Sequence, residues 1–144
     1  MSEGKGGGET VELLLPATPE WLALARTTGA AIASRWRFTY DEIADLRLAI
    51  DELCLTLIRP AQQEGEPRRL TLAYTLDGSS MVVRGQVDKP NPAAVNGDGQ
   101  APQPTSVSDL SERILDALVD EHGSERTDSQ LSAWLRKGRS VAAP

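Results

Sequence analysis

The sequence predicts an α+β fold, a two-layer sandwich in which helices cover one face of a mostly antiparallel sheet, with the element order β-α-α-β-β-loop-α-β. Two consecutive stretches between residues 19 and 60 carry apolar residues at helical spacing. Residues 70–87 instead alternate apolar and polar side chains around a central turn, which is typical of a β-hairpin. A further helix and strand follow a proline-rich segment, and this mixture favours one sheet covered by helices.

Length and charge set limits on the class of protein. The 144 residues suffice for one domain, which we place at 10–137 between tails at 1–9 and 138–144. Fifteen Lys and Arg against 21 Asp and Glu give a net charge of −6, which argues against nucleic-acid binding. No apolar run is long enough for a membrane helix or signal sequence, so we expect a cytoplasmic protein.

The single cysteine and the single histidine argue against metal chemistry. Cys54 alone cannot form an intrachain disulfide or a multi-thiolate site, and His122 has no second histidine with which to bind zinc. We therefore expect no metal site, a buried unreactive thiol at Cys54, and a histidine at the surface or at a helix end.

The first half of the chain contains a strand and two helices. The apolar run Thr10–Leu15 predicts a strand buried on both faces. Thr18 and Pro19 suit the start of a helix that extends to about residue 36. A second helix begins at the capping box of Thr39 and Glu42 and is expected to end at Pro60, before a polar loop. Its apolar stripe consists of Ile43, Leu46, Ile50, Leu53 and Leu57.

The second half contains the hairpin, an irregular segment, a helix and a strand. Residues 88–106 have no periodicity and many prolines, which indicates a functional loop or disorder. A third helix is predicted from Asp109, with Gly123 as its end. Alternation over 131–136 predicts the last strand, and a short strand is possible near 125–127.

The segment from Asp45 to Ile58, DLRLAIDELCLTLI, resembles the second helix of bacterial anti-sigma regulatory factors of the sigma-B and sigma-F type. These proteins belong to the histidine-kinase-like (GHKL) ATPase superfamily, whose pattern there is Leu-x-Leu-Ala-(Val/Ile)-x-Glu-x-x-x-Asn. Leu22–Arg26 is similar to the Leu-x-x-x-Arg of the family's first helix, and Leu118–Glu121 to the Leu-Val-Asp-Glu that ends its third. The resemblance implies a Bergerat-type sandwich over residues 10–137, with 88–106 as a degenerate nucleotide lid.

The resemblance also locates the family's ATP site, position by position. Glu52 corresponds to the general base, while Thr56 stands where the family has the Mg²⁺-binding Asn. Asp88 matches the adenine-reading Asp, but prolines replace the glycines that follow it. Asp109 and Ser111 stand where a glycine pair binds phosphate, and a carboxylate there repels the ligand. Glu52, Thr56 and Asp88 are therefore expected to be relics of a nucleotide site, with no cofactor bound.

We accordingly interpret the chain as an anti-sigma factor that sequesters an RNA-polymerase sigma factor, and we expect it not to act as an enzyme. The resemblance implies a homodimer, an anti-anti-sigma partner of the STAS fold that releases the sigma factor, and a sigma-facing arginine at Arg26. One alternative is an active Mg-ATP-dependent kinase that phosphorylates a serine of that antagonist. The other is an unrelated α+β module, which any different topology would favour.

Overall fold

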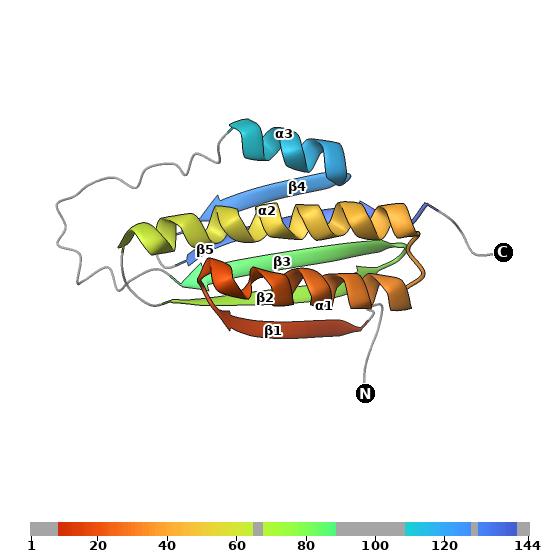
Figure 1. Ribbon diagram of the computed structural model, residues 1–144. Coiled ribbons are helices and arrows are strands. Elements are labelled where there is room, and N and C mark those ends of the chain that lie inside the picture. The colour runs from red at the N-terminus through yellow and green to blue at the C-terminus, as the bar shows by residue number, and fades with distance from the viewer. Residues whose placement is uncertain (1–8, 65–67, 89–108, 128–129, 141–144) are drawn as a thin grey trace.

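The computed structural model describes residues 9–64, 68–88, 109–127 and 130–140 (Figure 1). It contains a five-stranded antiparallel sheet in the order β1-β2-β3-β5-β4. The strands are β1 Thr10–Pro16, β2 Arg69–Asp77, β3 Ser80–Asp88, β4 Glu121–Arg126 and β5 Gln130–Gly138. The helices are η1 Pro19–Trp21, a 3₁₀ turn, and α1 Leu22–Arg35, α2 Tyr40–Glu64 and α3 Asp109–Leu118. All of them lie on one face of the sheet, as a two-layer α+β sandwich requires (Figure 1).

Helix α2 lies across the middle of the sheet between α1 and α3 (Figure 1). Leu46, Ile50 and Leu57 are fully buried, and Leu53 is almost so, as the stripe predicted. Ile43, at the start of the stripe, is partly buried against the core. The opposing sheet face is a set of fully or nearly fully buried side chains, namely Leu70, Leu72, Tyr74, Met81, Val83, Val87, Leu131 and Leu135.

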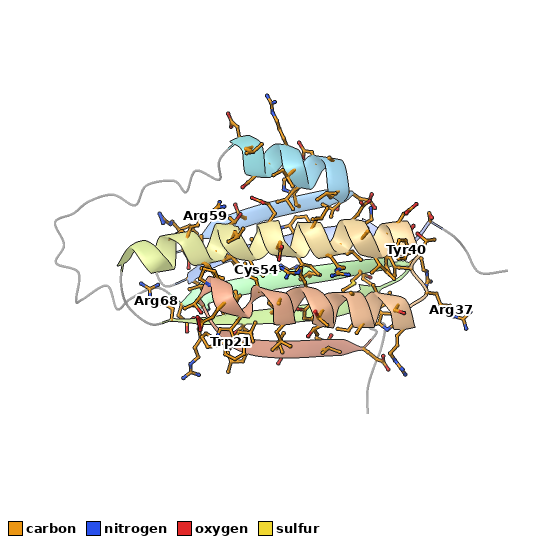
Figure 2. All side chains as sticks on the ribbon, viewed as in Figure 1. Trp21, Arg37, Tyr40, Cys54, Arg59 and Arg68 are labelled. Carbon is orange, nitrogen blue, oxygen red and sulfur yellow. The ribbon has the colours of Figure 1, made fainter. Side chains whose placement is uncertain are left out.

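Close approach between α1 and α2 depends on Gly29. A Cβ atom at this position would lie 2.3 Å from Cδ1 of Ile50, which is closer than two carbon atoms can approach without displacement. The absence of a side chain at Gly29 therefore lets α1 pack directly over Ile50 and Tyr74, whose hydroxyl donates a hydrogen bond to the Ala25 carbonyl at 2.9 Å. Cys54 on α2, labelled in Figure 2, is buried as predicted, and burial together with the nearby Asp51 charge raises the pKa of its thiol to about 12.

Three predictions in the first half of the chain were wrong. Strand β1 is an edge strand in which only Leu15 is buried, because its outer face receives no helix. Thr18 precedes a 3₁₀ turn rather than α1 itself, and its hydroxyl makes no capping hydrogen bond. Helix α2 continues through Pro60 to Glu64, since a proline removes only one amide donor and the backbone on either side still forms helical turns.

Two predictions in the second half also need correction. Helix α3 ends at Leu118, and Gly123 lies inside β4, where a Cβ atom would meet the Trp134 indole Nε1 at 2.9 Å. The short strand expected near 125–127 is therefore longer and begins at Glu121. The predicted tail at 1–9, apart from Glu9, and the predicted loop at 88–106, apart from Asp88, lie outside the described residues.

The corner between α1 and α2 is held by the predicted capping box and by the C-terminal residues. The Thr39 amide donates to Glu42 Oε1 at 2.8 Å, and the Glu42 amide donates to Thr39 Oγ1 at 3.2 Å. Ser140 donates its amide to Glu42 Oε2 at 2.7 Å, and the Arg139 guanidinium donates to the Trp36 carbonyl at 2.6 Å. The sequence analysis placed residues 138–140 in a tail, but Gly138 ends β5, and Arg139 and Ser140 fasten this corner.

The helices of the described residues include none that is long and apolar enough to cross a membrane.

We expect Leu53→Ala to lower the free energy of unfolding by about 2–5 kcal/mol, because it leaves a cavity between α2 and the sheet. Leu48, on the same helix but 57% exposed, is the matched control, and Leu48→Ala should cost less than about 0.5 kcal/mol. Urea denaturation of both variants measures the difference. Equal losses of unfolding free energy in the two variants would show that the face of α2 that carries Leu53 is not part of the core.

Glu42 gives the fold a pH-dependent contact. Burial raises the pKa of this carboxyl, but hydrogen bonds from Ser140 and Thr39 outweigh that effect and hold it at about 2, well below the ordinary value of 4.5. The carboxylate therefore stabilises the fold fully above about pH 4.5, and this contribution is lost as the pH falls towards 2.

Glu42→Gln should consequently cost about 1–3 kcal/mol at pH 7, since hydrogen bonds to a charged acceptor are lost. The difference in free energy of unfolding between the variant and the wild type should become smaller below about pH 4.5. Thermal unfolding from pH 7 to pH 3 measures it, with Asp41→Asn at the exposed neighbouring position as control. A stability difference that stays constant with pH would contradict the stabilising role of the Glu42 carboxylate.

Candidate functional site

Two adjacent carboxylates on α2 point towards different neighbouring helices. Asp51 and Glu52 are one residue apart, so their side chains leave the helix about 100° apart. Asp51 reaches α1 and Glu52 reaches α3, and α2 therefore joins both flanking helices through one pair of acids. Arg26, the predicted partner-binding residue, therefore lies on the α1 side of α2, and Glu52, the predicted general base, faces the α3 side.

Glu52, the predicted general base, is engaged by α3. Ser111, in the first turn of α3 and only 2% exposed, donates its hydroxyl to Glu52 Oε2. Ser111 is one of the two positions to which the resemblance assigned phosphate-binding glycines. The structure thus brings two predicted site positions together, and they contact each other directly.

Thr56 lies one turn after Glu52 on the same helix. Its hydroxyl donates to the Glu52 carbonyl at 3.0 Å, so this side chain bonds its own helix. Thr56 also lines a cavity of about 110 Å³ enclosed by α2, α3, β4 and β5. The other lining residues are Leu53, Glu112, Leu115, His122, Gly123, Ser124 and Ala133.

His122 was predicted to lie at the surface or at a helix end, and the structure places it in β4. Its Nε2 lies 2.7 Å from Oδ1 of Asp116 in α3, so the two groups form a hydrogen bond and, when the imidazole is protonated, an ion pair. The histidine therefore helps to hold α3 against the edge strand of the sheet.

Asp88, the predicted adenine-reading residue, is separate from this cavity. It is the exposed last residue of β3, paired across the sheet with Gln130, and it is absent from the cavity lining. Its backbone carbonyl accepts a hydrogen bond from the Arg68 guanidinium at 2.6 Å. In the described residues Asp88 is therefore not brought together with Glu52 and Thr56.

Arg26, the predicted partner-binding residue, lies on the opposite flank of α2. Its Nη1 donates to both carboxylate oxygens of Asp51, at 2.9 and 3.0 Å, and its side chain is 32% exposed. The pair borders an open groove of about 400 Å³ between α1 and the first half of α2. Tyr40, at the start of α2 in Figure 2, and Leu48 also line this groove and are 85% and 57% exposed.

The groove also contains a guanidinium with no partner nearby. Arg47 is exposed and forms no ion pair or side-chain hydrogen bond within the described part of the chain. Arg26 and Arg47 against Asp51 give the groove a net charge of +1 in a chain of net charge −6. Exposed apolar side chains beside a free guanidinium are typical of a protein-binding surface.

The described residues do not fit Mg-ATP in this arrangement. The cavity of about 110 Å³ is smaller than the roughly 300 Å³ at which small-molecule sites begin. Asp109 and Glu112 in the first turn of α3 repel phosphate, and Thr56 donates its proton to its own helix. Among the described residues no three His, Cys, Asp or Glu side chains are grouped to hold a metal ion.

Sequence reasoning missed Asp51, Tyr40, Arg47 and Leu48 as site residues. The partner of Asp51 lies 25 positions earlier in the chain, and no local pattern specifies such a contact. A signal did exist for Tyr40 and Leu48, two large apolar residues that lie outside the buried stripe of the same helix. Ser111 was placed at the site, but its bond to Glu52 depends on how α3 packs against α2.

The helices cover one face of a five-stranded antiparallel sheet, and Glu52 of the central helix faces α3, which is the arrangement of a two-layer α+β sandwich. The model of the histidine kinase-like ATPase domain matches residues 15–137, and the chain belongs to this family. The third interpretation, an unrelated module, was therefore wrong.

Individual relatives match about half of the chain. The chain is 33% identical over 70 residues to the serine-protein kinase RsbW of Bacillus subtilis, which covers 49% of this chain and 44% of that protein. It is 39% identical over 68 residues to RsbW of Bacillus cereus strain B4264, which covers 47% and 42%. The chain thus spans less than half the length of the curated relatives it matches.

Proposed function

We propose that this protein is an anti-sigma factor that binds an RNA-polymerase sigma factor through the groove between α1 and α2. The observation that carries the proposal is the groove itself, where Arg26 is held in place beside the exposed side chains of Tyr40 and Leu48. Membership in the histidine kinase-like ATPase family and similarity to RsbW support it. A STAS-fold antagonist competing for this protein releases the sigma factor, and the protein acts as a homodimer.

The ion pair with Asp51 prepares Arg26 for binding. A guanidinium held by one carboxylate loses less side-chain entropy when a second carboxylate arrives, and the Arg26 side chain is still 32% exposed. Arg47, about one turn before Asp51 on α2, adds a second positive charge to the groove wall. This arrangement suits an acidic partner segment with apolar neighbours, which packs on Leu48 and Tyr40.

In the proposed mechanism binding does not require phosphotransfer. Glu52 accepts the Ser111 hydroxyl, and the cavity at Thr56, one turn further along α2, is small, so partner exchange takes the place of phosphorylation. A second candidate function is an ATP-dependent serine kinase acting on the anti-anti-sigma factor. The relatives favour this candidate, since each of them is named a serine-protein kinase.

We expect Arg26→Ala to weaken the binding of the cognate sigma factor by about tenfold or more, as loss of a central arginine contact does. Its free energy of unfolding should change by less than about 1 kcal/mol, because a half-exposed ion pair contributes little to stability. Purified sigma factors from the same genome, titrated by calorimetry, provide the measurement. Arg84→Ala, at an exposed position in β3, is the control and should bind like wild type.

An unchanged affinity of the Arg26 variant would show that this residue is not part of the interface. Failure of the wild-type protein to bind any of the sigma factors would overturn the proposed function itself.

The kinase candidate is tested separately. Calorimetric titration with Mg-ATP should show no binding in the micromolar range, and no label should pass from ATP to a serine of the STAS partner. The RsbW protein of Bacillus subtilis is the positive control. Micromolar binding, or serine phosphorylation that Glu52→Ala abolishes, would establish the kinase instead.

A further inference from the structure

The two edges of the sheet differ in how they are protected against the addition of a further strand. β4, at one edge, carries Glu121, Glu125 and Arg126 in six residues and is joined to α3 through His122. Charged side chains of this kind discourage pairing with another strand. β1, at the other edge, has a single charged residue, Glu12, among its seven. The β1 side of the sheet therefore lacks the protection that the β4 side has.

Alternate backbone groups of β1 point away from the sheet. The Ala17 amide, directly after β1, donates to the Arg68 carbonyl at 2.9 Å, and the register along β1 has no bulge. The odd-numbered residues of β1 therefore bond to β2. The amides and carbonyls of the even-numbered Thr10, Glu12 and Leu14 face outwards, where the described part of the chain has no strand. They offer a partner strand three donors and three acceptors at ladder spacing.

Apolar side chains lie on both faces of this free edge. Seven large apolar side chains of the described residues are exposed, and four of them belong to β1 and the start of α1, namely Val11, Leu14, Trp21 and Leu24. Leu14 lies on the open face of the sheet and is 57% exposed, while Val11 is on the helix-covered face with the buried Leu15. A strand added beside β1 would cover apolar surface on both faces.

Trp21 and Leu24 face the β1 side of α1. A turn of about 100° per residue puts them about 60° apart, with Arg26 about 140° from Trp21. Arg26 bonds a carboxylate of α2, so Trp21 and Leu24 face away from α2. Beneath α1 lies β2, whose Tyr74 hydroxyl bonds the α1 backbone, and the strand beyond β2 is β1. Figure 1 accordingly shows α1 between α2 and β1, and Figure 2 labels Trp21 at the start of α1.

We propose that the β1 edge, defined as residues 10–14 with Trp21 and Leu24, binds an extended segment of a partner protein that adds a sixth strand to the sheet. In strand addition the backbone hydrogen bonds give affinity and the alternating side chains give specificity. Residues of the segment that lie on the helix side of the sheet are apolar, because they meet Val11 and Trp21. This inference goes beyond the proposed sigma binding and does not rest on it.

The charge around the β1 edge determines which segment fits. Glu9, Glu12 and Glu20 are exposed there, against Arg69 opposite Pro16 at the end of β1. This surplus of acids suits a segment that carries a lysine or arginine opposite Glu12. A second copy of this chain fits poorly, because antiparallel pairing of two β1 edges puts the two Glu12 side chains opposite or diagonal to each other.

A synthetic peptide with blocked ends and the central sequence Val-Ile-Lys-Ile-Thr tests strand addition. Paired antiparallel with β1, it places its lysine opposite Glu12 and its isoleucines opposite Val11 and Leu13. In hydrogen exchange followed by NMR, saturating peptide should slow the amides of Thr10, Glu12 and Leu14 about tenfold or more, because these amides gain an acceptor. The amides of Val11 and Leu13, which already bond to β2, should change little.

Two controls separate strand pairing from apolar adhesion. N-methylation of the lysine amide keeps every side chain but removes the donor to the Glu12 carbonyl, and it should weaken binding about tenfold or more. Trp21→Ala should weaken binding of the unmodified peptide about tenfold, as loss of an aromatic contact does. Leu110→Ala removes an exposed apolar side chain from α3 instead, and it should bind like wild type.

Reversal of charge tests the register. Glu12→Lys should weaken binding of the lysine peptide about tenfold, and it should prefer a peptide in which glutamate replaces the lysine. Loss of affinity for the lysine peptide without this change of preference would show that Glu12 does not face the central residue of the segment.

Three results would overturn the proposal. The first is no binding of the unmodified peptide up to about 1 mM. The second is equal binding of the N-methylated peptide, which would show adhesion without strand pairing. The third is slow exchange of the Thr10, Glu12 and Leu14 amides without peptide that is lost on dilution, because a second copy would then occupy the edge. Sigma binding is measured with a different ligand, so failure of either proposal leaves the other standing.

Discussion

The packing of α2 on the sheet is the constraint on which the rest of this structure depends. Leu46, Ile50 and Leu57 are fully buried, so α2 cannot turn about its axis without exposing part of the core. That fixed rotation determines where its polar side chains go, and it aims Asp51 at α1 and Glu52 at α3. At the N-terminal end, Glu42 joins the helix to the α1–α2 corner and to Ser140 after β5. The buried stripe and this corner together define the geometry of both flanks of the helix.

The two flanks are suited to different chemistry because their neighbours differ. On the α1 side, Arg26 is held by Asp51 beside the exposed Leu48, and an open groove of about 400 Å³ remains for a partner. On the α3 side, Ser111 occupies Glu52 and leaves a cavity of about 110 Å³. The first flank has the size and the side chains of a protein-binding surface, and the second has little space for a ligand. This contrast supports protein binding over phosphotransfer in our proposal, whereas the names of the relatives favour the kinase.

The sequence predicted elements well where a local periodic pattern determines the structure. The α2 stripe, the Thr39–Glu42 capping box and the hairpin of β2 and β3 are of this kind, because each depends on residues close together in the chain. Prediction failed where tertiary packing determines the ends of an element. Pro60 suggested a helix end, yet α2 continues for one more turn. Gly123 likewise suggested a helix end, but it lies in β4, where its lack of a side chain accommodates Trp134. At the candidate site the sequence indicated the residue types, while the contacts that engage them join positions 25 and 59 residues apart.

We propose that this protein binds a sigma factor through the α1–α2 groove without help from a nucleotide. The most direct test is sedimentation of the purified protein with its cognate sigma factor, with no nucleotide and then with Mg-ADP or Mg-ATP. Our account predicts a stable complex in the absence of nucleotide whose affinity none of these additions changes. A complex that forms only with Mg-ATP or Mg-ADP would contradict it, and would show that the flank of α2 beside Glu52 binds nucleotide after all.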